Sequence, residues 1–171
     1  NEINHPFTAI IGGANISTKI NLISNLANKA SSSVDGGGIA YTFLKAAGFE
    51  IGESLFEKDF IQVAEKLLET GKIHLPNQVY VGSHINTDKS IIKDLDELEP
   101  TDRIFDLKLN NKIISNLKES KTILWNGPLV VFENKVCEQG TQELAKIISN
   151  SKAFSVAGGG ETLTASNKFI S

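Results

Sequence analysis

The chain has 171 residues, a formal net charge of −3, and 40% hydrophobic and 22% charged residues. This length suits one folded domain, and the apolar content is too high for a wholly disordered chain. The slightly acidic balance disfavours nucleic-acid-binding and membrane-surface modules, because both usually present a basic face. We therefore expect a single domain over residues 1–171 that binds neither nucleic acid nor membrane.

Cysteine content and the absence of targeting features predict a cytoplasmic location. Cys137 is the one cysteine, so no internal disulfide can form, which favours a reducing compartment. No apolar run approaches the roughly 18 residues that span a bilayer, and residues 1–7 do not resemble a signal peptide. The chain starts without Met and stops soon after a glycine cluster, so we interpret it as a fragment of a longer protein. We also expect a monomer.

The first half of the chain begins with a short β-branched run at residues 8–11, which predicts a buried strand. Helical spacing of apolar residues predicts helices over residues 16–30, 40–47 and 59–69, the last two stopped by Gly48 and Gly71.

The second half continues the alternation of strands and helices. Strands are predicted at residues 79–81, 122–125 and 153–157, and helices at 111–117, 138–148 and from about 162. Strands that alternate with helices indicate βαβ units, and hence an α/β domain whose mostly parallel sheet has helices on both faces.

Small or turn-forming residues follow four of the strand regions. These turns are Gly12-Gly13-Ala14, Gly36-Gly37-Gly38, Asn126-Gly127-Pro128 and Gly158-Gly159-Gly160. Because ligands of parallel sheets bind beyond the carboxyl ends of the strands, all four turns should meet at one ligand-binding edge.

Glycine turns at helix N-termini favour phosphate binding. Their exposed N–H groups and the helix dipole attract an anion, and because glycine has no side chain, the anion can approach the backbone closely. Each turn taken alone favours a tight strand-to-helix connection that binds no ligand, and only the four together favour a binding site. None of the four matches the P-loop or the G-x-G-x-x-G pattern, which disfavours a P-loop kinase and a standard dinucleotide-binding domain.

Four segments are similar to phosphoglycerate kinases in order and spacing. They are Ala9-Ile-Ile-Gly-Gly-Ala-Asn-Ile-Ser-Thr-Lys-Ile20, Gly36-Gly-Gly-Ile-Ala-Tyr-Thr-Phe-Leu-Lys-Ala46, Trp125-Asn-Gly-Pro-Leu-Val-Val-Phe-Glu133 and Gly158-Gly-Gly-Glu-Thr162. The resemblance covers nearly the whole chain and points to the C-terminal domain of that family.

This resemblance implies a Rossmann-like domain that binds ADP or ATP with Mg²⁺. It also implies that 3-phosphoglycerate binds on an N-terminal domain that this chain lacks. The family transfers a phosphoryl group between 1,3-bisphosphoglycerate and ADP in glycolysis, a reaction helped by positioning and charge neutralisation.

The resemblance assigns a nucleotide site residue by residue. Lys19 would contact the phosphates, Val131 the nucleoside and Glu133 the ribose hydroxyls. Asn15, Lys19, Gly159 and Gly160 would take part in catalysis, and Glu161 would hold the metal. The full set is Gly13, Ala14, Asn15, Lys19, Gly37, Gly38, Asn126, Gly127, Pro128, Val131, Glu133, Gly159, Gly160, Glu161 and Thr162.

Two departures from the family pattern affect catalysis. Asn15 stands where the family has a lysine on the transferring phosphoryl group, so a charge is lost there. Glu161 stands where the family has the aspartate that binds Mg²⁺, an ion that tolerates misplaced ligands poorly. Other departures affect stability or nucleotide fit, namely Val130, Ser83, the polar run 31–35 and the missing Gly-Pro after Asp106.

Three interpretations stay open. The chain is the nucleotide-binding half of a phosphoglycerate kinase, a pseudo-kinase domain that only binds nucleotide, or an unrelated domain with fortuitous glycines. No second chemistry competes with these, because His5, His74 and His84 lack metal-ligand spacing and fit surface or loop positions, and Cys137 fits a structural thiol.

Overall fold

The computed structural model describes residues 3–82, 89–129 and 139–158. Within these residues the main sheet has the strand order β3-β2-β1-β7-β8, and each neighbouring pair is parallel. Its strands are β1 (Phe7–Gly12), β2 (Ser32–Gly36), β3 (Ile73–His74), β7 (Thr122–Asn126) and β8 (Phe154–Gly158). The expected parallel α/β sheet is thus confirmed.

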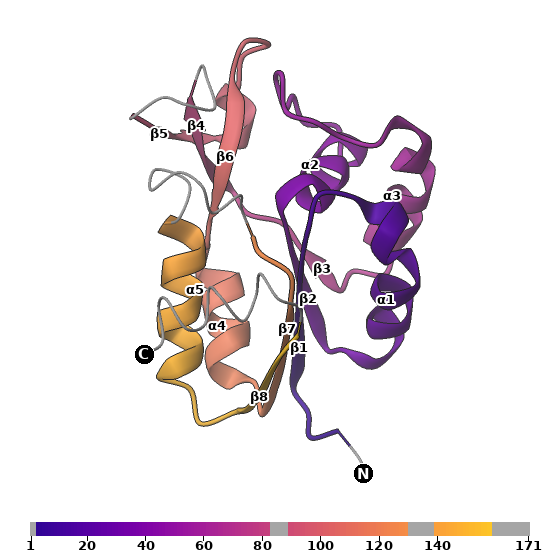
Figure 1. Ribbon diagram of the computed structural model, residues 1–171, viewed down its shortest axis with the longest axis vertical. Helices are drawn as coiled ribbons and strands as arrows, with labels where there is room; N and C mark the ends of the chain where they lie inside the picture. The colour runs from indigo at the N-terminus through magenta and orange to yellow at the C-terminus, as the bar shows by residue number, and fades with distance from the viewer. Residues whose placement is uncertain (1–2, 83–88, 130–138, 159–171) are drawn as a thin grey trace.

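Helices cover both faces of this sheet, as the alternation of elements predicts. Figure 1 shows α4 and α5 on one side of the strands and α1 and α3 on the other. The described helices are α1 (Ile16–Lys29), α2 (Gly37–Ala46), α3 (Ile61–Leu68), α4 (Asn111–Glu119) and α5 (Gln139–Ser149).

Successive residues of the central strand pack into different layers, because neighbouring side chains of a strand point to opposite faces. Ile10 belongs to the core shared with α4 and α5, whereas Ile11 belongs to the core shared with α1, α2 and α3. Both are fully buried. The main sheet therefore forms the middle of three layers, with one apolar core on each of its faces.

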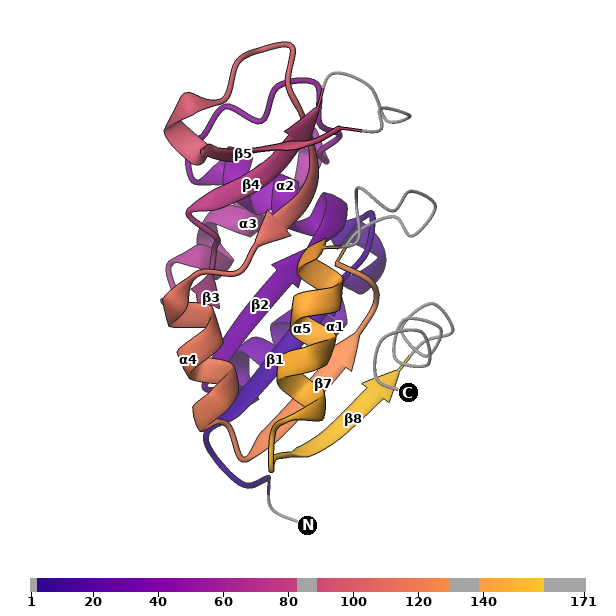
Figure 2. The same ribbon diagram turned by 90° about the vertical axis from the view of Figure 1, so that its left-hand side faces the viewer.

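A second, antiparallel sheet was not expected from the sequence. It has the order β5-β4-β6 and consists of β4 (Gln78–Gly82), β5 (Ile91–Asp94) and β6 (Arg103–Lys108). The strand predicted at residues 79–81 is present, but it lies in this sheet and not in the parallel one. Its valines pack with Ala40 and Leu44 of α2, which fixes the second sheet against that helix in the upper part of Figure 2.

Several element boundaries differ from the predictions. Helix α2 begins at Gly37 instead of residue 40, and the 59–69 segment forms a 3-10 turn (Lys58–Phe60) followed by α3. The polar run at residues 31–35 contributes most of β2, a strand buried along its whole length. The helix expected from about residue 162 lies outside the described residues.

In the part of the chain that the structure describes, no helix is both long and apolar enough to cross a membrane.

Candidate functional site

Three of the glycine turns, and Gly158 at the start of the fourth, meet at one edge of the main sheet, as predicted. In the strand register Gly12 lies opposite Gly36, Ile11 lies opposite Asn126, and Asn126 lies opposite Gly158. The arrowheads of β2, β7 and β8 accordingly point toward the same side in Figure 2, and β1 is parallel to β2 and β7. We call this side the carboxyl edge.

The first two turns are in direct contact. The Ile39 amide of α2 donates a hydrogen bond of 3.1 Å to the Gly13 carbonyl oxygen. A Cβ on Gly38 would lie 2.1 Å from the Ala14 carbonyl oxygen, so only glycine allows this approach. The two turns therefore hold each other in place through their backbones.

Lys19 joins the first turn to the third. Its ammonium group donates to the Gly12 carbonyl oxygen and, at 3.0 Å, to the Asn126 Oδ1 atom. Gly127 has a φ angle of +83°, and a Cβ there would lie 2.4 Å from the Lys19 Nζ atom. Lys19 is half-buried between two turns, so it is not simply a solvated helix lysine.

The N-termini of α1 and α2 open onto the carboxyl edge with little negative charge of their own. Neither helix has an acidic residue in its first turn or a side-chain hydrogen bond from its N-cap residue. Asn15, the N-cap of α1, and Ala14 before it are exposed. A helix N-terminus carries a partial positive charge and N–H groups that have no acceptor within the helix, which makes this edge suited to anions.

Two residues outside the predicted set brace the first two turns. A Glu57 carboxylate oxygen accepts a 3.0 Å hydrogen bond from the Ser17 amide in the first turn of α1. The Glu57 amide donates to the Thr42 hydroxyl, which in turn donates to the Gly38 carbonyl oxygen, both at 3.1 Å. Glu57 and Thr42 thus link the N-terminus of α1 to the second glycine turn.

Asp35 places a buried carboxyl group directly before the second turn. It is 1% exposed, and neither carboxylate oxygen has a hydrogen-bond partner. Burial raises the pKa of Asp35 from 3.8 to about 7, and no charged neighbour contributes to this shift. Asp35 therefore destabilises the fold when it is ionised. Because its side chain is buried, it cannot contact a ligand bound at the surface.

The described residues include nine of the predicted site residues, and all nine lie in the three contiguous turns or at the start of α1. These are Gly13, Ala14, Asn15, Lys19, Gly37, Gly38, Asn126, Gly127 and Pro128. The other six, Val131, Glu133, Gly159, Gly160, Glu161 and Thr162, lie outside the described residues.

The remaining polar candidates lie elsewhere. His5 is exposed, with its Nδ1 atom 3.1 Å from the Ser31 hydroxyl oxygen. His74 is not in a loop as expected but in β3, where burial lowers its pKa. His84 and Cys137 lie outside the described residues. Over residues 3–82, 89–129 and 139–158, no group of three His, Cys, Asp or Glu side chains could hold a metal.

Comparison with known proteins gives one consistent result. The sequence profile of the phosphoglycerate kinase family matches residues 1–171. A phosphoglycerate kinase from Vibrio campbellii is 42% identical over 167 residues, which are 96% of this chain and 43% of the relative. The chain thus spans less than half the length of the curated relative that it matches.

Solved structures agree with this match. The phosphoglycerate kinase of Coxiella burnetii is 37% identical with a TM-score of 0.93, and the alignment covers 98% of this chain and 45% of that one. The enzyme of Pyrococcus horikoshii is 25% identical with a TM-score of 0.79, covering 97% and 44% of the two chains.

Proposed function

The chain belongs to the phosphoglycerate kinase family, and from this membership we propose that it supplies the ADP or ATP site of a phosphoglycerate kinase. The observation that carries the proposal is the meeting of three described glycine turns, two of them joined by Lys19, beside two helix N-termini that no N-cap side chain serves. The nucleotide lies on these turns at the carboxyl edge of the sheet, the usual ligand position in parallel α/β folds.

The phosphates of the nucleotide lie against backbone N–H groups of the turns. An approach this close requires small residues, which Gly13, Ala14 and Gly38 provide. Lys19 supplies a fixed positive charge, and its bond to Asn126 keeps the ammonium group at the edge. Positioning and charge neutralisation of this kind are the main means of catalysing phosphoryl transfer.

The reaction is reversible phosphoryl transfer between 1,3-bisphosphoglycerate and ADP. We infer from the family resemblance that a part of the protein outside this chain binds 3-phosphoglycerate, and the 43% coverage of the relative is compatible with such a part. Mg²⁺ enters with the nucleotide and offsets phosphate charge. Because Mg²⁺ in such sites is held mainly by phosphates, waters and one or two carboxylates, Glu161 alone could complete its ligands.

The residues outside the described part complete the proposed site. Val131 contacts the nucleoside and Glu133 hydrogen-bonds the ribose hydroxyls. Gly159, Gly160 and Thr162 contact the β- and γ-phosphates. These roles are supported by the resemblance of segments 125–133 and 158–162 to phosphoglycerate kinases.

A domain that binds nucleotide without transferring phosphate is the second candidate. Asn15 favours it, because this exposed N-cap residue brings no charge to a phosphoryl group where the family has lysine. A missing donor at such a position typically costs about 3–4 kcal/mol of transition-state stabilisation. Both candidates require nucleotide binding, and they differ only in turnover.

Titration calorimetry with ADP and Mg²⁺ on the folded chain tests the proposal. We expect saturable binding that Lys19→Met weakens, because the substitution removes the cation between the first and third turns. Lys66→Met, on an exposed part of α3, is the matched control and should leave binding unchanged. No binding at millimolar nucleotide would contradict both candidates.

A further inference from the structure

Asp35 is the last side chain of β2 before the second glycine turn. It is followed by Gly36, Gly37 and Gly38, the turn from which α2 begins. Consecutive Cα atoms are about 3.8 Å apart, so the Cα atoms of Asp35 and Gly37 lie within about 8 Å of each other. The second turn packs on the first, because a Cβ on Gly37 would lie 2.7 Å from the Gly13 carbonyl oxygen. A charge on Asp35 therefore lies next to both turns of the proposed nucleotide site.

No described group compensates such a charge. Asp35 is 1% exposed, and neither of its carboxylate oxygens has a hydrogen-bond partner. It pairs with Ile11 of β1, whose side chain belongs to the core shared with α1, α2 and α3, so Asp35 faces these helices. The titratable side chains on these helices and on the neighbouring β3 are Lys19, Lys29, Tyr41, Lys45, Glu65, Lys66 and His74. None of them contributes to the pKa of Asp35, which burial alone raises from 3.8 to about 7.

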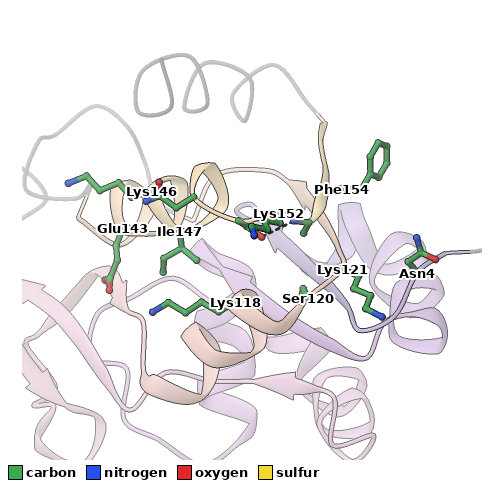
Figure 3. Close-up of a pocket in the computed structure, with 12 residues that line it drawn as sticks. Asn4, Lys118, Ser120, Lys121, Glu143, Lys146, Ile147, Lys152 and Phe154 are labelled. Carbon is green, nitrogen blue, oxygen red and sulfur yellow. Dashed lines mark hydrogen bonds between the residues drawn. The ribbon is translucent and has the colours of Figure 1, made fainter.

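A cleft of about 860 Å³ in the described part of the chain does not supply a counter-ion to Asp35 either. It lies at the opposite edge of the sheet, where α4 and α5 end and where β7 and β8 begin. Figure 3 shows its lining residues there, among them Lys118, Lys146 and Phe154. Asp35 is not one of them, so an ionised Asp35 has no cation within this cleft to pair with.

The proton on Asp35 and an anion on the turns therefore act on the same place. The folded chain keeps the carboxyl group neutral below about pH 7, and above this pH the proton passes to the solvent. The ionised carboxylate then repels an anion on the turns. This repulsion is stronger than between charges in water, because the protein interior screens charge less.

We propose that Asp35 makes the glycine turns a pH-sensitive site, which binds a nucleoside diphosphate tightly while Asp35 is protonated and more weakly once it is ionised. This inference rests on the proposed nucleotide site. Asp35 touches no ligand and acts through its charge alone. It belongs to the run 31–35, which is polar where phosphoglycerate kinases are apolar, so the family resemblance does not imply this property.

Titration calorimetry with ADP and Mg²⁺ on this chain and on Asp35→Asn, at about pH 5.5 and about pH 8.5, tests the proposal. Asparagine has nearly the shape of a protonated aspartate but does not ionise. We expect similar Kd values for the two proteins at the lower pH, and at the higher pH binding by the unaltered chain that is weaker by about threefold or more. Protonation of ADP itself contributes equally to both proteins and cancels in the comparison.

Asp96→Asn is the matched control, because Asp96 is an exposed carboxyl group on the 3-10 turn (Leu95–Glu97) that follows β5. This variant removes the same charge and should keep the pH dependence of the unaltered chain. Circular dichroism at both pH values checks that each protein is folded.

A second measurement needs no variant. NMR of the Asp35 carboxyl carbon gives its pKa with and without saturating ADP, and because the coupling between two ligands is reciprocal, bound ADP must raise this pKa. ADP binding with the same pH dependence in the unaltered chain and in Asp35→Asn, or a pKa that ADP does not change, would overturn this proposal and leave the nucleotide site standing. No ADP binding at either pH would overturn both.

Discussion

Replacing Asp35 by valine should stabilise the domain, and the gain should grow with pH. Asp35 is fully buried in β2, opposite Ile11 of β1, and its carboxylate oxygens have no hydrogen-bond partner. Valine suits a buried strand position and removes the unpaired polar atoms, which typically cost about 1–3 kcal/mol. This part of the gain is the same at every pH.

The pH-dependent part follows from the pKa of Asp35, which burial raises from 3.8 to about 7. The folded state then binds the proton more tightly than the unfolded state, so the stabilising effect of protonation is complete below about pH 4 and is lost as pH rises toward 7. Each pKa unit corresponds to about 1.4 kcal/mol. The full shift therefore lowers the free energy of unfolding by about 4 kcal/mol above pH 7.

Urea unfolding followed by the fluorescence of Trp125, a buried residue and the only tryptophan, measures this effect. Between pH 5 and pH 8, the advantage of Asp35→Val over the unaltered chain should grow by about 3 kcal/mol. Burial also raises the pKa of Asp106, to about 8, although two backbone amides donate to its carboxylate. That group is present in both proteins, so it cancels in the difference.

Ser33→Val is the matched control. Ser33 lies on the same face of β2, is 3% exposed, and has a hydroxyl oxygen without a partner, but it does not titrate in this range. Its substitution should stabilise the domain equally at both pH values. If the advantage of Asp35→Val is also the same at pH 5 and pH 8, the reasoning from burial to a raised pKa is refuted.

Further predictions concern the carboxyl edge. Glu57→Ala should weaken ADP binding several-fold in calorimetry. Glu57→Gln should not, because its side-chain oxygen still accepts from the Ser17 amide of α1. An equal loss of affinity in both variants would contradict a positioning role for Glu57. Thr42→Val should shorten the exchange lifetime of the Glu57 amide hydrogen in NMR, because that amide loses its acceptor; unchanged exchange would refute the link. Gly38→Ala should lower the melting temperature by several degrees, because the new Cβ would lie 2.1 Å from a carbonyl oxygen, and an unchanged value would contradict the close packing of the turns. Asn15→Lys in a full-length parent should raise kcat by more than tenfold and change the Kd for ADP less; an unchanged kcat would mean that Asn15 is not the limiting defect.

Most strands and helices around the site could be predicted because their signals are local, whereas β2 was not, because residues 31–35 are polar. The apolar run in β1, the helical spacing in α1 and the turn residues of each strand end are all readable within a few positions. Once the strands are parallel, their carboxyl ends must meet, so the shared edge follows from the pattern alone.

The antiparallel sheet could not be predicted in the same way. Ile91 and Ile92 of β5 are exposed, so that strand lacks a clear buried face. β6 contains the buried charged residue Asp106, which interrupts its apolar character. Both strands are defined by their pairing with β4, a contact that sequence periodicity does not encode.

The bracing of the site was missed for a related reason. Glu57 contacts Ser17 across 40 positions and Thr42 across 15, and neither residue belongs to a glycine turn. One signal was available in the sequence. The helix that begins after Asn15 has no acidic residue in its first turn, which favours a carboxylate from another segment as the acceptor for its amides. Sequence alone could not say which of the 20 acidic residues does so.

The most direct test of the proposed nucleotide site is an NMR titration of the labelled chain with ADP and Mg²⁺, in which amide shifts are mapped onto the sheet. The account predicts large, saturable shifts for Gly13, Ala14, Gly38 and Gly127 at the carboxyl edge, and negligible shifts at the opposite edge, where β7 and β8 begin. Shifts confined to that opposite edge, or none at millimolar nucleotide, would contradict the placement of the nucleotide on the glycine turns.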